Sequence, residues 1–228
     1  MSIEVNVSDW KGMLDCAKMY MTEATIHIGD KKAWILEIDD TKTNLVFVEI
    51  ACDGEADFTV NLEKFGRALI ASGADPVIDV EEGYLRIEGT ARVKVPLVVK
   101  ENKVRWPDKF KESIASCDIA PSQLDPVLSY GQFCNQSVVR FTLGDTRMNI
   151  QVGTGADMSE ITSLSTAVGE SMSVFSLPLI QSIMKLTKGL ESVTVHGFGN
   201  NMPMIFTWAT GTGVYRILIA PFIDEDNP

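Results

Sequence analysis

Apolar residues recur along this chain with two periods, which predict helices and strands in alternation. A spacing of three to four residues runs through positions 10–21 and marks one buried stripe: Trp10, Met13, Leu14, Ala17 and Met21. A period of two follows in residues 26–38 and predicts two strands joined by a turn at Gly29-Asp30. Residues 5–38 should therefore form strand, helix, strand, turn and strand, with Ser8 as the helix N-cap.

The same order of elements returns halfway along the chain. Residues 117–119 and 121–133 predict a strand and a helix, and strands at 138–143 and 148–152 enclose a second turn at Gly144-Asp145. The glycines of the two turns are 115 positions apart in a chain of 228 residues. This repeat predicts two similar domains in tandem.

A second pair of helices recurs at a similar interval. Residues 61–70 predict a helix stopped by Gly73, and residues 176–188 predict one stopped by Gly189, 116 positions later. Each helix is followed by two short strands, at 77–80 and 84–88 in the first case and at 193–195 and 204–208 in the second. We predict an α+β fold with antiparallel sheets, two helices and eight or nine strands in each half.

The boundary between the halves is expected in a charged stretch without clean periodicity. Residues 100–111 contain five Lys or Arg residues together with Pro107, which is typical of a linker. We therefore predict an N-terminal domain at 1–99, a linker at 100–111 and a C-terminal domain at 112–228.

Three of the four predicted helices carry two basic residues away from their apolar stripes: Lys11 with Lys18, Lys64 with Arg67, and Lys185 with Lys188. The whole chain has a net charge of −11, which argues against a protein that binds nucleic acid through its overall charge. Any single pair is expected on an ordinary solvated helix face, and the last pair also suits the end of a helix. Their recurrence in an acidic chain favours a local basic surface.

Composition narrows the remaining classes of protein. Hydrophobic residues make up 45% of the chain, enough for a substantial core, but no run reaches the roughly 18 apolar residues of a membrane span. The N-terminus lacks the pattern of a signal peptide, so an intracellular protein is expected. The cysteines have no metal-ligand spacing and are expected to be reduced, buried thiols, with no metal or cofactor: Cys16, Cys52, Cys117 and Cys134.

An enzyme is the main alternative class. Its best candidates would be Cys16, His27 or His196 beside a carboxylate, but histidines at alternating strand positions are more often packing or surface residues. The glycine pairs at 197–199 and 211–213 do not lead into a predicted helix, as a phosphate-binding loop would require. The sequence therefore favours a protein without catalytic residues.

Short motifs throughout the chain resemble the sliding clamps of the proliferating cell nuclear antigen (PCNA) type, in the style of archaeal or viral members. Residues 215–226 are similar to the family's closing strand, Ala-Pro turn and acidic tail. Residues 175–177, 202–204 and 38–46 resemble the start of its last helix, a following strand and its Met-Asp to Leu-Val loop.

The resemblance implies a DNA clamp fold and a homotrimeric, pseudo-six-fold ring around duplex DNA. Such a ring is a processivity factor that tethers DNA polymerase, the clamp loader and other replication and repair proteins. In this chain Lys18 matches a helix lysine of the family, and the other basic residues fall on helices that would line the hole: Lys11, Lys64, Arg67, Lys185 and Lys188. The helix at 121–133 departs from the pattern because it has no Lys or Arg, and we expect it to contact DNA weakly.

The resemblance also implies a pocket between the domains that receives a short peptide. Its expected members are Ile38, Val104, Trp106, Pro107, Pro203, Leu218, Ala220 and Pro221. Buried apolar anchors of this kind supply most of the energy of an interface. For Trp106 the alternative is that it pins the linker onto a domain.

Subunits of the family join through sheet edges, which implies pairing of the edge at 91–98 with the edge at 158–165 of a neighbour. Two variants of the functional hypothesis stay open. The chain could be one subunit of a hetero-oligomeric clamp, or a ring that recruits nucleases or ligases in place of a polymerase. The expected location is the cytoplasm or nucleoid of an archaeon or of a virus-infected cell, or the nucleus of a eukaryote.

Overall fold

The structure is a computed structural model that describes residues 2–99, 104–144, 146–153, 158–164, 166–167 and 169–222. Four parts of the sequence-based predictions lie outside the described residues: linker positions 100–103, Asp145 of the second turn, Ser165 of the expected edge and the acidic tail at 224–226.

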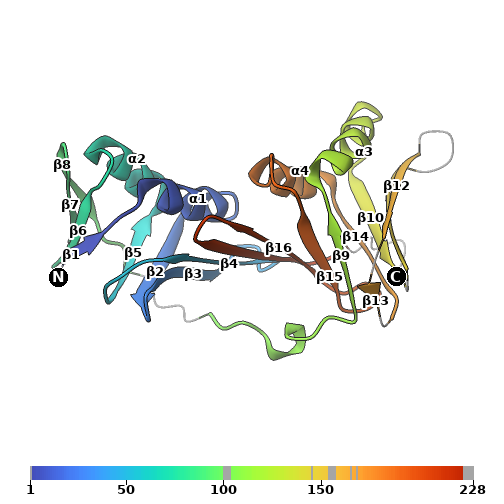
Figure 1. Ribbon diagram of the computed structural model, residues 1–228, viewed down its shortest axis with the longest axis horizontal. Helices are drawn as coiled ribbons and strands as arrows, with labels where there is room; N and C mark the ends of the chain where they lie inside the picture. The colour runs from blue at the N-terminus through green and yellow to red at the C-terminus, as the bar shows by residue number, and fades with distance from the viewer. Residues whose placement is uncertain are drawn as a thin grey trace. The chain divides into compact units, whose positions relative to one another are not determined.

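The chain forms two compact units (Figure 1). One consists of Met1–Arg105 and Ala209–Arg216, and the other of Trp106–Trp208 and Ile217–Pro228. The change of unit at 105–106 falls inside the predicted linker. Residues 209–216 were expected in the C-terminal domain from their position in the sequence, but they pack with the first unit.

The first unit contains two helices and eight strands in the order β1 (Ser2–Glu4), α1 (Val7–Lys18), β2 (Glu23–Gly29), β3 (Lys32–Ile38), β4 (Asn44–Ala51), β5 (Ala56–Asn61), α2 (Leu62–Ser72), β6 (Val77–Glu81), β7 (Tyr84–Glu88) and β8 (Arg92–Pro96). Its strands follow the orders β1-β6-β7-β8 and β4-β3-β2-β5. All the strand pairs given for this unit are antiparallel.

The second half of the chain contains η1 (Asp108–Phe110), β9 (Ala115–Ile119), α3 (Pro121–Phe133), β10 (Val138–Leu143), β11 (Arg147–Val152), β12 (Ser159–Leu164), β13 (Thr166–Ala167), β14 (Ser171–Ser176), α4 (Leu177–Leu186), β15 (Val193–Gly197), β16 (Met204–Thr210) and β17 (Gly213–Ile219). Its strand orders, β9-β15-β16-β17 and β12-β11-β10-β14, match those of the first half strand for strand. The predicted tandem repeat and α+β class are therefore confirmed, with β13 as an addition.

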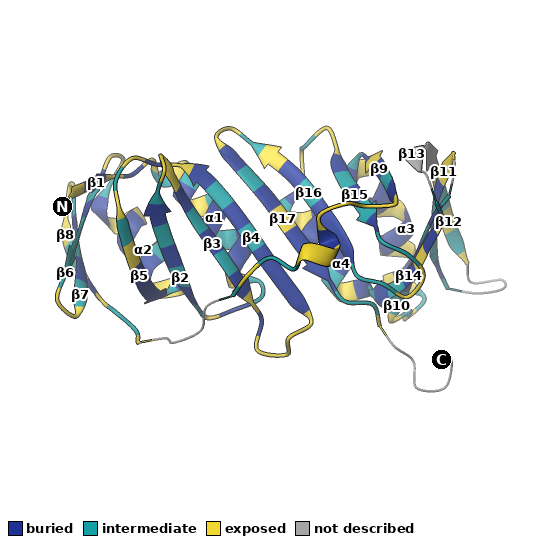
Figure 2. Ribbon diagram, turned by 90° about the horizontal axis from the view of Figure 1, so that it is seen from below, coloured by how far each residue is buried: buried dark blue, intermediate teal, exposed yellow. Residues whose placement is uncertain are grey.

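Each unit is built around a cluster of aromatic side chains beneath its two helices. In the first unit Phe65 of α2 packs edge-on against Trp10 of α1 and Phe58 of β5, with ring centroids 5.7 and 5.9 Å apart. In the second unit Phe141 packs in the same way against Phe175 and Phe206, at 5.8 and 5.7 Å. Figure 2 shows that buried and half-buried positions alternate along strands such as β2 and β3, so one face of each strand contributes to the core.

The predicted apolar stripe of α1 is confirmed, but its N-cap prediction was wrong. Trp10, Met13, Leu14, Ala17 and Met21 are all buried. The helix begins at Val7, and the side chain of Asn6 accepts hydrogen bonds from the backbone N–H groups of Ser8 and Asp9, at 3.0 and 3.2 Å. Asn and Ser are both good caps, so local preference alone does not separate them.

The last helix is shorter than predicted. It ends at Leu186, and the Thr187 hydroxyl donates to the carbonyl of Ile183 at 3.0 Å, which leaves Lys188 beyond the helix. The prediction extended to Lys188 because Gly189 is a helix-terminating residue at the next position.

The segment Ala209–Arg216 completes the first unit by docking on α1. The Thr212 hydroxyl donates to the Asp9 carboxylate at 2.7 Å, and Arg216 lies over the ring of Phe47 at 5.6 Å. Tyr215 is only 4% exposed, and a Cβ added at Gly12 would lie 2.6 Å from its hydroxyl oxygen. Gly12 is thus required for this close approach.

Candidate functional site

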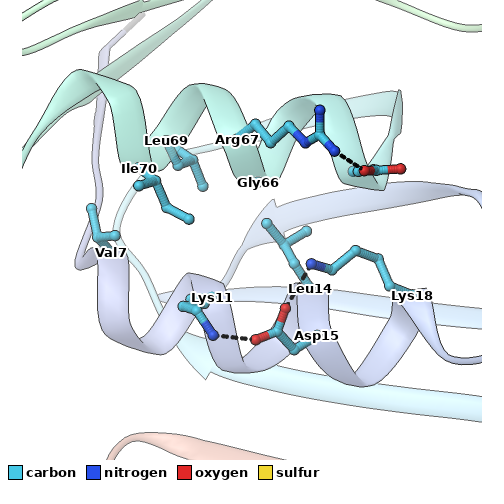
Figure 3. Close-up of a pocket in the computed structure, with 10 residues that line it drawn as sticks. Val7, Lys11, Leu14, Asp15, Lys18, Gly66, Arg67, Leu69 and Ile70 are labelled. Atoms are coloured by element: carbon cyan, nitrogen blue, oxygen red, sulfur yellow. Dashed lines mark hydrogen bonds and ion pairs between the residues drawn. The ribbon is translucent and has the colours of Figure 1, made fainter.

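The predicted basic residues of the first unit lie around a groove between α1 and α2 (Figure 3). The groove has a volume of about 170 Å³, and Lys11, Lys18 and Arg67 are among its lining residues. Its apolar part is formed by Val7, Leu14, Leu69 and Ile70. The structure therefore brings three of the four predicted cations of this unit to one surface.

The Asp15 carboxylate is bonded to both lysines of α1. Its carboxylate forms ion pairs with Lys11, one turn earlier, and with Lys18 at 2.6 Å, as Figure 3 shows. Burial alone would raise the pKa of Asp15, but the hydrogen bonds and charges of the two lysines outweigh it and hold the pKa below its usual value. Asp15 is therefore ionised at neutral pH, and the three side chains together carry a charge of +1.

The two basic residues of α2 differ in whether they form an ion pair. Arg67 is ion-paired with Glu63, one turn earlier on the same helix. Lys64 is exposed, and no ion pair of its ammonium is found among the residues that the structure describes. Its backbone N–H donates to the N-cap Asn61 at 3.1 Å.

The two predicted basic residues of the second unit differ from those of α1 in their surroundings. Lys185 lies in the last turn of α4 and Lys188 just after it, and both are exposed. Neither forms an ion pair within the described parts of the chain. Their ammonium groups are therefore open to external anions.

Helix α3 lacks basic residues, as noted from the sequence, and exposes two aromatic side chains instead. Phe133 is 83% exposed and Tyr130 is 38% exposed. The helix also contains Pro126 in its interior, which leaves one backbone carbonyl without an intrahelical partner.

The predicted peptide-pocket residues are divided between the units. Ile38 and Val104 belong to the first unit, and Trp106, Pro107, Pro203, Leu218, Ala220 and Pro221 belong to the second. Leu218 is buried, Ile38 is 38% exposed, and the other six are half-buried. Near the start of the second unit Phe110 packs edge-on against Phe198 at 5.2 Å and anchors the segment that follows Pro107.

The loop after Ile38 is fixed by one carboxylate. Asp39 accepts hydrogen bonds from the backbone N–H groups of Thr43 and Asn44 at 2.8 and 3.0 Å, from the Thr41 hydroxyl at 2.7 Å and from the Asn44 amide at 2.6 Å. Burial favours a higher pKa for Asp39, but these hydrogen bonds outweigh it and lower the pKa. The exposed Ile38 side chain thus precedes a rigid turn.

The sequence analysis missed three residues of these surfaces. Phe222 is 51% exposed directly after Pro221, and its backbone N–H donates to the Val174 carbonyl at 2.7 Å. Asp15 and Glu63 do not stand out in the sequence, because the spacing of the basic residues does not depend on them. Their positions one turn from Lys11 and Arg67 were a readable signal.

The two expected subunit edges are present as edge strands. β8 is the last strand of the order β1-β6-β7-β8, and β12 is the first of the order β12-β11-β10-β14. Arg92 and Lys94 are exposed on β8, and Glu160 is exposed on β12.

Cys16 and His27, which were considered as catalytic residues, are respectively buried and paired with a neighbouring side chain. Burial raises the pKa of the Cys16 thiol to about 12, so it is not a nucleophile at neutral pH. His27 pairs with Asp57 at 2.6 Å and stacks on Trp34.

Within the described residues no group of three or more His, Cys, Asp or Glu side chains could hold a metal ion. A search of the same residues also finds no helix with the length and apolar character needed to cross a bilayer.

The chain is similar to solved structures of PCNA over nearly its whole length. It matches A. fulgidus PCNA bound to the C-terminal region of FEN-1 with a TM-score of 0.84 and 18% identity, over 98% of this chain and 99% of that one. It matches PCNA from Thermococcus kodakaraensis with a TM-score of 0.80 and 13% identity, over 97% and 99%. A PCNA2–PCNA3 complex from Sulfolobus tokodaii contains a chain matched with a TM-score of 0.77 and 16% identity, over 97% and 99%.

No protein-family model matches the sequence, and no curated protein matches it significantly. At these low identities the structural likeness establishes the fold, and the predicted clamp fold is confirmed.

Proposed function

We propose that this chain is a subunit of a sliding clamp, a homotrimeric ring that encircles duplex DNA and tethers DNA polymerase and other replication and repair proteins to it. The observation that supports this most is the agreement of the fold with PCNA from end to end, with a TM-score of 0.84 over 98% of the chain. The proposed role is that of a scaffold, without catalysis.

The distribution of charge supports a DNA-facing role for the helices. Helices α1 to α4 contain five Lys or Arg residues and four Asp or Glu residues, against 20 and 31 in the whole chain. The excess of acid is therefore carried by strands and loops. A closed ring retains DNA by its topology, so it needs only a few weak phosphate contacts on one face, and acidic outer surfaces keep DNA away from the others.

The edge strands β8 and β12 are the proposed joints of the ring. An exposed strand edge readily pairs with another chain, and pairing would remove two such edges at each joint. The exposed Arg92 and Lys94 of β8 and Glu160 of β12 are complementary in charge.

For the partner proteins we assign the apolar residues that follow Leu218 in the second unit to a peptide-binding surface. Phe222 joins the residues predicted there because it is exposed and directly follows Pro221. A short peptide with an aliphatic and an aromatic anchor fits such a surface. The C-terminal region of FEN-1, which binds A. fulgidus PCNA, is a suitable probe.

The first test is the solution mass measured by light scattering at low and high salt, followed by retention on DNA. A homotrimer has a mass of about 75 kDa, three times the 25.1 kDa of the chain. A loaded ring should stay on closed circular DNA and slide off after the circle is linearised. Equal loss from both forms would contradict encirclement.

A hetero-oligomeric clamp, the alternative left open by the sequence, is not favoured over the homotrimer, although one matched chain comes from a PCNA2–PCNA3 complex. It predicts a chain that stays monomeric alone at every concentration. Recovery of a trimer-sized species only after a second clamp-like chain is added would support this candidate over the homotrimer.

A further inference from the structure

Asp15 lies between the two α1 lysines that the proposed function places against DNA. Its carboxylate is ion-paired with both Lys11 and Lys18, and the three side chains line the same groove (Figure 3). A phosphate that approaches either lysine must therefore compete with a carboxylate that is already in place.

Helix stability explains a carboxylate at this position only in part. Asp15 begins the last turn of α1, near the negative end of the helix dipole, where acidic residues are unfavourable. Its pairing with Lys11 has the basic residue first, which is the weaker order for residues four apart. Its pairing with Lys18, three residues later, has the favourable order, but Lys18 also suits the last turn of the helix without a partner.

Glu63 provides the contrast on the neighbouring helix. It lies in the first turn of α2, at the positive end of the dipole, and it precedes Arg67 by four residues in the favourable order. Both the position and the pairing of Glu63 stabilise its own helix, whereas Asp15 combines one favourable pairing with an unfavourable position.

Beyond the two lysines, the one cation among the residues that line the groove is Arg67, which is ion-paired with Glu63. The floor of the groove is apolar, and Ile70 is 59% exposed there. A Cβ added at Gly66 would lie 3.9 Å from the Lys18 Nζ atom, so this ammonium sits close to the backbone of α2. Binding of an external anion on the α1 side thus depends on lysines that are already ion-paired with Asp15.

We propose that Asp15 is a built-in competitor of DNA phosphate, which weakens the α1 contacts so that a ring retained by topology can slide. This inference rests on the proposed clamp function and names a residue that tunes its contact with DNA. Asp15 itself does not touch DNA in this role, and it acts by positioning Lys11 and Lys18.

The test compares wild type with Asp15→Asn by fluorescence anisotropy of a labelled short duplex, titrated with the full-length protein at several salt concentrations. Each phosphate contact adds about 0.9 to the slope of log affinity against log salt, or about a three- to fourfold further loss between 50 and 200 mM. We expect Asp15→Asn to bind more tightly at low salt, with a slope steeper by about one to two.

The matched control is Asp57→Asn, which makes the same change of charge in the same unit. Asp57 is exposed on β5 next to Phe58, whose ring faces α2, so Asp57 points to the opposite face of the sheet. Asp57→Asn should leave the slope unchanged. Asp15→Ser, which lacks the amide, should behave like Asp15→Asn, and thermal melting should confirm that all three variants are folded.

The outcomes separate this inference from the function on which it rests. If Asp15→Asn has the wild-type slope while truncation of Lys185 and Lys188 weakens binding, the role of Asp15 is wrong and the clamp proposal stands. Equal shifts in Asp15→Asn and Asp57→Asn would show a general charge effect and would also overturn the inference. If neither wild type nor Asp15→Asn binds the duplex at low salt, the role of Asp15 is wrong, and the clamp proposal is decided by retention on circular and linear DNA.

Discussion

At the scale of single residues, two helical glycines with different surroundings give opposite expectations. A Cβ at Gly131 of α3 would lie 2.2 Å from Cγ1 of Val152, whereas a Cβ at Gly66 of α2 would meet Leu14 at an ordinary 3.7 Å. Gly131→Ala should cost about 1–3 kcal/mol because it overpacks the contact with β11. Gly66→Ala should add about 0.5–1 kcal/mol because alanine favours a helix. Urea unfolding of both variants measures the difference, and equal effects would contradict the packing described for α3.

The Asp39 carboxylate predicts a dependence of stability on pH. Its pKa is lowered in the folded chain, so its contribution is present above the unfolded pKa of about 3.9 and is lost as the pH falls through the folded pKa. Asp39→Asn should cost about 2 kcal/mol at pH 7, and the difference from wild type should shrink below about pH 4. A difference that stays constant down to pH 2 would refute the role of the charge.

The sequence predicted which apolar helix residues are buried. It did not predict which polar side chains and backbone groups bond to each other. The apolar spacing of Trp10, Met13 and Leu14 was sufficient because burial follows from helix geometry. The bonds of Asp15 and Asp39 depend on side-chain directions that a spacing does not specify. The same holds for the cap, where Asn6 and Ser8 were both suitable and the structure uses Asn6.

At the scale of the elements, the helices differ in how available their cations are. Lys185 and Lys188 have no ion-pair partners among the described residues, whereas Lys11 and Lys18 share Asp15. Replacing Lys185 and Lys188 with alanine should therefore reduce the salt slope of DNA binding by about one per lost contact, and replacing Lys11 and Lys18 should reduce it less. Anisotropy titrations of the two double variants test this, and a larger effect from the α1 pair would reverse the ranking.

Helix boundaries were predicted best where a residue prevents the helix from continuing or favours its start. Helix α3 was predicted at its observed bounds because Pro121 suits the first turn of a helix. The end of α4 was misplaced by two residues because Thr187 closes the helix through its own side-chain hydrogen bond, which the sequence does not display. Strand orders were not predicted from the sequence, and the structure shows that equivalent strands occupy equivalent places in both halves.

At the scale of the whole molecule, substitutions in the edge strands test whether the chain assembles into a ring. Val95 is only 2% exposed and belongs to the core of its own unit, so Val93, which is half-buried on the same strand, is the better probe. Val93→Lys should place an unpaired charge at the joint and convert the 75 kDa species, three times 25.1 kDa, to the monomer. Light scattering at matched concentration measures this.

The control for that experiment is Ser2→Lys on β1, the strand at the opposite end of the order β1-β6-β7-β8. Ser2 is exposed, so the variant should fold and keep the oligomeric mass of the wild type. If Val93→Lys retains that mass as well, β8 is not a joint of the ring.

The docking of Ala209–Arg216 on the first unit has a consequence for synthesis. Asp9 and Thr212 are bonded across 203 positions, so the ribosome makes the last part of the N-terminal unit only after nearly all of the second unit has been translated. A nascent chain that stops before position 209 leaves the surface of α1 around Gly12 uncovered. The usual order, in which an N-terminal domain is complete before the next begins, does not apply to this chain. We therefore expect the first unit to reach its final packing only after residues 209–216 have left the exit tunnel.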